Sequence, residues 1–172
     1  LWESLLILVG GDETTRHVIS GGMERLLHDP EQFERLQRDR SLLPSAAEEM
    51  IRWVTPIQNM ARTATRDVEL GGETIRAGDK LLLLYPSANR DERVFAEPFR
   101  FDVARSPNDH LAFGYGAHFC LGASLARLEV RVFFDELLER MPRLERVDEA
   151  PLRHRPSNFI SGIEELRVRV AA

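Results

Sequence analysis

The feature that most restricts the local fold is the ten-residue stretch FGYGAHFCLG at residues 113–122. Three of its residues are glycine (Gly114, Gly116 and Gly122), which permits backbone conformations and close approaches that a side chain would forbid. The stretch therefore predicts a tight loop. It also contains Cys120, the only cysteine in the sequence. A lone cysteine can be a small buried hydrophobic residue, a nucleophile or a ligand, and the residue type alone leaves all three interpretations open.

Composition excludes several classes of protein. The 172 residues include 28 acidic and 23 basic side chains, with a net charge of -5 and no long single-sign run, which argues against a nucleic-acid partner. No apolar segment approaches the roughly 20 residues that cross a bilayer, so we expect no membrane span. A single cysteine forms no internal disulfide, and Leu1 begins no visible signal peptide, so we expect a cytoplasmic protein. The chain begins as though cut from a longer one.

Helices are predicted in the first third of the sequence. Apolar spacing indicates a helix over residues 2–28, which two glycine pairs are expected to interrupt and weaken. Pro30 marks the start of a second helix. Ser45 and Glu48 are spaced as a capping box that opens a third helix, and Pro56 must end it.

The remaining sequence alternates strands, coil and one more helix. Turn residues separate three predicted short strands, at residues 66–70, 73–76 and 80–85. Residues 87–108 are rich in proline and charge and predict irregular coil with one helical turn. Apolar spacing then predicts a helix over 122–140 that Pro142 stops, followed by a tail that ends in an alternating strand at 166–170. The expected fold is mainly α with small β-sheets, an α+β arrangement.

Residues 113–122 resemble the haem-binding signature of the cytochrome P450 family. The agreement covers its fixed positions, which are Phe113, Gly114, Gly116, Cys120 and Gly122. In that family the cysteine thiolate is the axial ligand of the haem iron, so the resemblance implies haem b as cofactor and Cys120 as its metal ligand. A planar macrocycle could lie against such a glycine-rich loop. A helix that begins near Leu121 would direct backbone N–H groups at the Cys120 sulfur and favour the thiolate.

The resemblance assigns further haem contacts. It implies that Phe113 and Gly114 lie against the haem and that His118, where many members carry arginine, donates to a propionate. Arg62 matches an arginine that binds a haem propionate in bacterial members. Without the resemblance, His118 is an ordinary loop histidine, and Arg62 is equally well explained as an exposed arginine on a strand.

A second motif precedes the strands. Glu49 and Arg52 resemble the family's Glu-x-x-Arg pair on helix K, and Arg105 is the arginine expected to complete a structural network with them, with His110 a weaker candidate. The three-residue spacing places Glu49 and Arg52 on one face of a helix. Taken alone, such a pair is usually solvated and contributes a few tenths of a kcal/mol.

A third motif lies near the start of the chain. Glu13 and Thr14 resemble the acid and alcohol of the oxygen-activating segment on helix I, which deliver protons through water. A carboxylic acid and a hydroxyl can form such a relay. The residues alone favour another interpretation, in which Asp12 or Thr14 caps a helical turn.

The resemblance as a whole implies a haem-thiolate monooxygenase. The reaction would insert one atom of dioxygen into a C–H bond of a lipophilic, steroid-like substrate, with electrons from a ferredoxin and its ferredoxin reductase. The positions expected to face the substrate are Val9, Gly10, Ile57 and Phe159. The similarity is to actinobacterial members that hydroxylate steroid side chains.

Other interpretations remain open. Residues 1–172 are expected to form a partial P450 domain, from helix I to the carboxy terminus, with the amino-terminal half absent. The chain would then be either an enzyme or a non-catalytic remnant that binds haem weakly or not at all. Two further alternatives are an α+β protein with unused motifs and a cysteine hydrolase that pairs Cys120 with His110 or His118.

Overall fold

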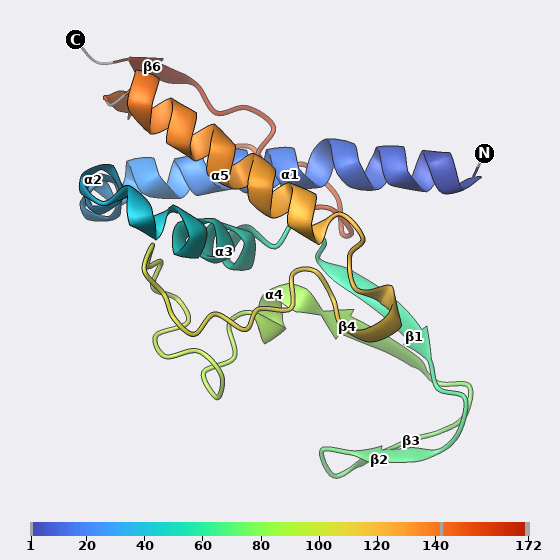
Figure 1. Ribbon diagram of the computed structural model, residues 1–172. Helices are drawn as coiled ribbons and strands as arrows, with labels where there is room; N and C mark the ends of the chain where they lie inside the picture. The colour runs from blue at the N-terminus through green and yellow to red at the C-terminus, as the bar shows by residue number, and fades with distance from the viewer. Residues whose placement is uncertain (1, 142, 171–172) are drawn as a thin grey trace.

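Helices form the packed part of the molecule. The structure, a computed structural model, describes residues 2–141 and 143–170, and the side chains of residues 2, 3, 5, 6 and 9 lie outside that description. In Figure 1, α5 (Ala123–Arg140) crosses in front of α1 (Trp2–His28), and α3 (Leu43–Val54) lies beside α1. Each of these three helices packs against the other two. Leu26, Met50 and Phe134, one from each helix, are at most 2% exposed. Their burial stabilises the fold by about 1.5–3 kcal/mol per side chain.

The first helix runs without a break, so the prediction that two glycine pairs would interrupt it was wrong. A Cβ added at Gly21 would lie 2.7 Å from Val54 Cγ2, and one at Gly22 would lie 2.8 Å from Met50 Cγ. These glycines therefore let the backbones of α1 and α3 approach closely. Close packing offsets the roughly 1 kcal/mol that a glycine costs inside a helix.

Two short helical segments lead into α3, namely α2 (Pro30–Arg38) and the 3-10 turn η1 (Arg40–Leu42). The start at Pro30 is as predicted. Helix α3 begins at Leu43, so the predicted capping box at Ser45 was wrong. The Ser45 hydroxyl instead donates to the carbonyl oxygen of Val103 at 2.7 Å, which ties the helix to a distant loop. Helix α3 ends two residues before Pro56.

The strands form three two-stranded antiparallel sheets, and each predicted strand is present with shorter ends. They pair as β1 (Asn59–Thr63) with β4 (Lys80–Leu84), β2 (Val68–Leu70) with β3 (Glu73–Ile75), and β5 (Leu144–Arg146) with β6 (Val168–Val170). Gly71 and Gly72 join β2 to β3 with φ angles of 63° and 88°, which a tight hairpin turn requires. Helices with small sheets agree with the predicted fold class.

A long coil connects the helical turn α4 (Tyr85–Ala88) to the 3-10 turn η2 (Gly116–His118), as the sequence predicts. This coil is anchored in the core, because Asn89, Phe95, Phe101 and Val103 are at most 3% exposed. It therefore holds a fixed course past α3 toward the cysteine loop. Pro142, the expected terminator of the last helix, lies outside the described residues.

Candidate functional site

The loop that carries Cys120 is shaped by two glycines. Gly114 and Gly116 have φ angles of 71° and 73°, in the left-handed region that other residues rarely occupy. The backbone N–H of Cys120 donates to the carbonyl oxygen of Phe113 at 3.0 Å, and that of Phe119 donates to Gly116 at 3.0 Å. These bonds close the loop on itself and set the position of the cysteine at its end.

The Cys120 thiol is free and exposed, at the point where the loop enters α5. The helix begins at Ala123, close to the predicted start near Leu121, and the Ala123 N–H donates to the Cys120 carbonyl oxygen at 3.2 Å. An added Cβ at Gly122 would lie 3.9 Å from the Cys120 sulfur, so this glycine leaves room beside the thiol.

Apolar side chains next to the thiol in sequence are unusually exposed. Tyr115 is 86% exposed, Phe119 51% and Leu121 92%. Exposed apolar surface of this kind marks a place where another apolar surface binds. The thiol is exposed, its neighbours in sequence are apolar, and the glycines of the loop have no side chains to obstruct a ligand. These features fit a large flat apolar group with a metal at its centre.

The two residues expected to hold propionates lie on separate elements. Arg62 is on β1 opposite Leu81, and its guanidinium donates to the carbonyl oxygen of Ala61 at 2.9 Å. His118 is in η2, within the cysteine loop. Both side chains are exposed and are open to an anionic partner.

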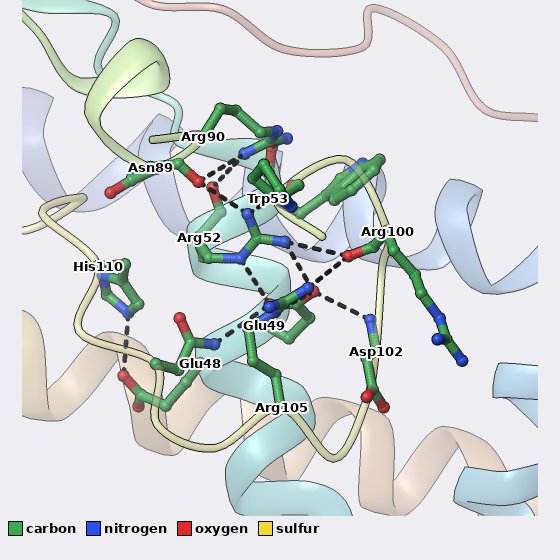
Figure 2. A network of polar contacts seen from close by, with 12 residues as sticks. Glu48, Glu49, Arg52, Trp53, Asn89, Arg90, Arg100, Asp102, Arg105 and His110 are labelled. Carbon is green, nitrogen blue, oxygen red and sulfur yellow. Dashed lines mark hydrogen bonds and ion pairs between the residues drawn. The ribbon is translucent and has the colours of Figure 1, made fainter. Parts of the chain in front are cut away.

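The structure brings Glu49, Arg52 and Arg105 together in a network, drawn in Figure 2. Both Glu49 oxygens accept from Arg52, at 2.7 and 2.8 Å, and Arg105 Nε lies 3.1 and 3.2 Å from the same carboxylate. Glu49 and Arg52 are fully buried. The Asp102 backbone N–H and the Asn108 side-chain amide also donate to this carboxylate, at 3.0 and 3.2 Å. The network therefore fastens α3 to the coil that leads to the cysteine loop.

His110, the weaker candidate for this network, is bonded instead to Glu48, the neighbour of Glu49, at 3.0 Å (Figure 2). The Glu48 carboxylate also accepts from Arg127 of α5 at 2.6 and 2.9 Å. Burial on its own would raise the pKa of Glu48, but hydrogen bonds from His110 and Arg127 outweigh it and lower the pKa to about 2.

Sequence reasoning missed Asn89, which is fully buried. Its side chain donates to the Thr55 hydroxyl at 2.8 Å and accepts from the Leu111 N–H at 2.7 Å, and its carbonyl accepts from Arg52 at 2.7 Å. Thr55 has a φ of 41°, a strained conformation for a β-branched residue. The position of Asn89 just after a proline turn was the one local signal, and it does not distinguish a buried asparagine from an exposed one.

Glu13 and Thr14 are both engaged. The Thr14 hydroxyl donates to the Gly10 carbonyl oxygen one turn earlier at 2.7 Å. The Glu13 carboxylate forms an ion pair with Arg155 from the carboxy-terminal tail and lies 3.6 Å from Arg16. The hydrogen bond from Arg155 lowers the pKa of Glu13, so this acid is ionised at neutral pH.

The positions expected to face a substrate fall into two groups. Ile57 forms an isolated β-bridge with Ile160, and the Gln58 N–H donates to the Phe159 carbonyl oxygen at 2.8 Å, so two segments about 100 residues apart lie together. Phe159 is 42% exposed. Gly10 lies on an exposed part of α1. The Val9 side chain lies outside the described residues.

Two features are absent from the described residues, a membrane-spanning helix and a cluster of metal-binding side chains. Within residues 2–141 and 143–170, no helix has both the length and the apolar character needed to cross a membrane. In the same residues, His, Cys, Asp and Glu side chains form no group of three or more that could hold a metal ion.

The chain matches proteins of known family over nearly its whole length. The family model described as Cytochrome P450 matches residues 2–166. A steroid C26-monooxygenase of Mycobacterium tuberculosis (strain H37Rv) is 56% identical over 167 residues, which are 96% of this chain and 42% of that protein. A methyl-branched lipid omega-hydroxylase of Mycobacterium bovis is 52% identical over 166 residues, 95% of this chain and 38% of that protein.

Solved structures agree with these relatives. CYP109E1 from Bacillus megaterium in complex with testosterone has a TM-score of 0.94 at 40% identity and covers 98% of this chain and 47% of its own. P450BioI bound to an acyl carrier protein that carries hexadec-9Z-enoic acid has a TM-score of 0.92 at 44% identity, over 96% of this chain and 43% of its own. The chain thus spans less than half the length of these proteins.

Proposed function

The chain belongs to the cytochrome P450 family, and on this premise we propose that it supplies the haem-thiolate half of a monooxygenase that hydroxylates a lipophilic, steroid-like substrate. The observation that carries the proposal is the exposed Cys120 thiol at the end of a glycine-shaped loop, where α5 begins. We assign Cys120 as the axial ligand of haem b. Residues 1–172 would then be the part of the P450 domain from helix I to the carboxy terminus.

Thiolate-ligated haem supplies the activation of dioxygen for insertion of one oxygen atom into a C–H bond. The protein residues have narrower tasks in this proposal. Phe113 and Gly114 line the ligand loop, and Arg62 and His118, both exposed, donate to the two propionates. The buried Glu49 and Arg52 pair, with Arg105, holds the coil that leads to the loop.

Glu13 and Thr14 are proposed to hold and pass protons on the distal side. The Thr14 hydroxyl donates to the Gly10 carbonyl and retains two lone pairs that can accept from water. Arg155 keeps Glu13 ionised, and an ionised carboxylate accepts hydrogen bonds from water. The Glu13 side chain is 25% exposed, so water can reach it.

The substrate class is proposed from the relatives and from the neutral character of the four positions expected to face a substrate. The relatives include a steroid monooxygenase and a methyl-branched lipid hydroxylase, and Ile57, Phe159, Val9 and Gly10 carry no charge. Electrons are proposed to come from a ferredoxin and its ferredoxin reductase.

A carbon monoxide difference spectrum tests the ligand. The reduced, haem-loaded full-length protein should show a strongly red-shifted Soret band that Cys120→Ala abolishes. His118→Ala should weaken haem retention. His154→Ala, a histidine substitution in the tail, is its matched control. A red-shifted band that survives in Cys120→Ala would overturn the assignment. Absence of haem uptake by folded protein would favour a non-catalytic remnant.

Product analysis tests the substrate. The haem-loaded protein, supplied with a ferredoxin, its reductase and NADPH, should hydroxylate a steroid with an aliphatic side chain. A methyl-branched lipid is the comparison, because the second relative is a methyl-branched lipid omega-hydroxylase. Turnover of this lipid alone would replace the steroid assignment by a lipid one.

A further inference from the structure

A second ion-pair cluster, separate from the Glu49 network, lies beside the cysteine loop. Glu48 of α3 accepts from Arg127 of α5 through both oxygens, with Nε to Oε1 at 2.6 Å and Nη2 to Oε2 at 2.9 Å. This two-point geometry fixes the plane of the guanidinium more firmly than a single contact would. The Glu48 side chain is 26% exposed and that of Arg127 34%, so water screens the pair only in part.

His110 is held in a defined state by the same carboxylate. Its Nδ1 accepts from the Ala112 N–H at 3.3 Å, which requires that nitrogen to be unprotonated. Its Nε2 lies 3.0 Å from Glu48 Oε2 and must therefore be the nitrogen that carries the hydrogen and donates it. The His110 side chain is 1% exposed. The ring is thus locked between Glu48 and the backbone that leads into the loop.

Both partners of Glu48 contact Phe113, the first residue of the loop. The Arg127 guanidinium carbon lies 4.7 Å from the centre of the Phe113 ring, and the His110 ring centre lies 5.8 Å from it. A guanidinium over an aromatic face is attractive and is worth about 0.5–2 kcal/mol. The Phe113 carbonyl in turn accepts the Cys120 N–H at 3.0 Å. An unbroken series of contacts therefore runs from Glu48 to the cysteine.

We propose that Glu48, with Arg127 and His110, forms a positioning cluster that sets the orientation of Phe113 and thereby the placement of the Cys120 sulfur. The side-chain hydrogen bonds of Glu48 go to His110 and Arg127, which contact Phe113, so Glu48 acts on the thiol through the loop. The consequence for a thiolate ligand rests on the function proposed above. The effect of Glu48 on the loop does not rest on that function, because all the contacts between Glu48 and the loop lie within the protein.

The first arm of the test uses haem-free full-length protein. Glu48→Gln removes the charge that holds both partners, and Arg127→Lys keeps the charge but loses the planar fork. Each should change the rate of Cys120 alkylation by iodoacetamide at least about twofold, the size of effect expected from contacts that couple through one residue. Asp135→Asn is the control, because it removes another ion pair of α5, with Arg40 at 2.9 Å, that does not touch the loop.

Alkylation rates of Glu48→Gln and Arg127→Lys equal to those of the wild type and Asp135→Asn would overturn the proposal. Circular dichroism establishes that each variant is folded before its rate is compared. If Glu48→Gln does not fold, Arg127→Lys decides, together with Phe113→Leu, which leaves the ion pair intact and removes the ring.

The second arm uses haem-loaded protein and measures the position of the Soret band, which a general loss of stability would not shift. The reduced carbon monoxide complex of Glu48→Gln should show a shifted Soret band or a mixture of two bands, whereas Asp135→Asn keeps the wild-type spectrum. Unchanged spectra in all variants would count against the proposal. A wild-type protein without a thiolate band would defeat the proposed function and leave the alkylation arm to decide the positioning.

Discussion

Arg52 donates two parallel hydrogen bonds to Glu49, which lies one helical turn earlier, from Nε to Oε2 at 2.7 Å and from Nη2 to Oε1 at 2.8 Å. Neither side chain is exposed. Removing two opposite charges from water is costly, and their mutual attraction offsets this cost only while both are present. Arg52 also donates to the carbonyl oxygens of Asn89 at 2.7 Å, Pro98 at 3.0 Å and Arg100 at 3.4 Å. The pair therefore joins one helix to three points of the coil.

Glu49→Gln should destabilise the protein strongly. It leaves the buried Arg52 charge without its counter-ion, and removal of one partner of a buried pair costs about 3–5 kcal/mol. Urea unfolding followed by circular dichroism measures the change. Glu97→Gln is the control, because its pair with Arg100 is 70% and 56% exposed and should contribute no more than about 1 kcal/mol. Similar losses in the two variants would contradict the argument.

Stability should depend on Glu48 at acid pH. The pKa of this carboxyl is lowered from 4.5 to about 2, so its stabilisation is complete above about pH 5 and is lost as the pH falls through about 2. One pKa unit corresponds to about 1.4 kcal/mol, so this contribution has an upper limit of about 3.4 kcal/mol, and solvent screening of the partly exposed side chain makes it smaller.

The measurement is the free energy of unfolding of wild type and Glu48→Gln between pH 6 and pH 2. The difference between the two proteins should shrink steadily toward low pH. Glu136→Gln, which removes an exposed pair with Arg140, should run parallel to the wild type. A constant gap between wild type and Glu48→Gln would show that charge on Glu48 does not stabilise the fold.

Arg155→Ala should raise the pKa of Glu13 toward its ordinary value of 4.5, because the hydrogen bond from Arg155 is the main cause of its depression. An NMR titration of the Glu13 side-chain carboxyl would follow the shift directly. Arg153→Ala removes a neighbouring, more exposed pair with Glu164 and should leave the Glu13 titration unchanged. An unchanged pKa in Arg155→Ala would mean that the tail does not control this acid.

Gly162→Ala should destabilise the contact between the tail and α1. An added Cβ would lie 1.9 Å from Nδ1 of His17, which is only 5% exposed and has little room to move. Overpacking of this kind costs about 1–3 kcal/mol. Thermal unfolding measures the loss, and His17→Ala combined with Gly162→Ala should recover part of it.

Gly11→Ala is the matched glycine substitution. An added Cβ there would meet no described atom within 4 Å, and alanine is favoured over glycine inside a helix by about 1 kcal/mol. Its melting temperature should stay level or rise. If both glycine substitutions lowered stability equally, crowding at His17 would not be the cause.

The sequence by itself determined what depends on short-range chemistry. The glycine content of residues 113–122 predicted a tight loop there, proline placed the start of α2, and turn residues separated the strands. A three-residue spacing placed Glu49 and Arg52 on one helix face. Each of these follows from the backbone preferences of a few adjacent residues, and those preferences act whatever the rest of the chain does.

Tertiary structure alone decided which distant groups meet. Glu48 finds its partners 62 and 79 residues away, and Glu13 finds Arg155 across 142 residues. Ser45 lies inside α3 instead of capping it, and its hydroxyl bonds a carbonyl 58 residues away. The glycines at 21 and 22 stay helical because α3 packs on them. Such outcomes are set by packing, since a local preference of about 1 kcal/mol yields to the larger free energy of a well-filled core.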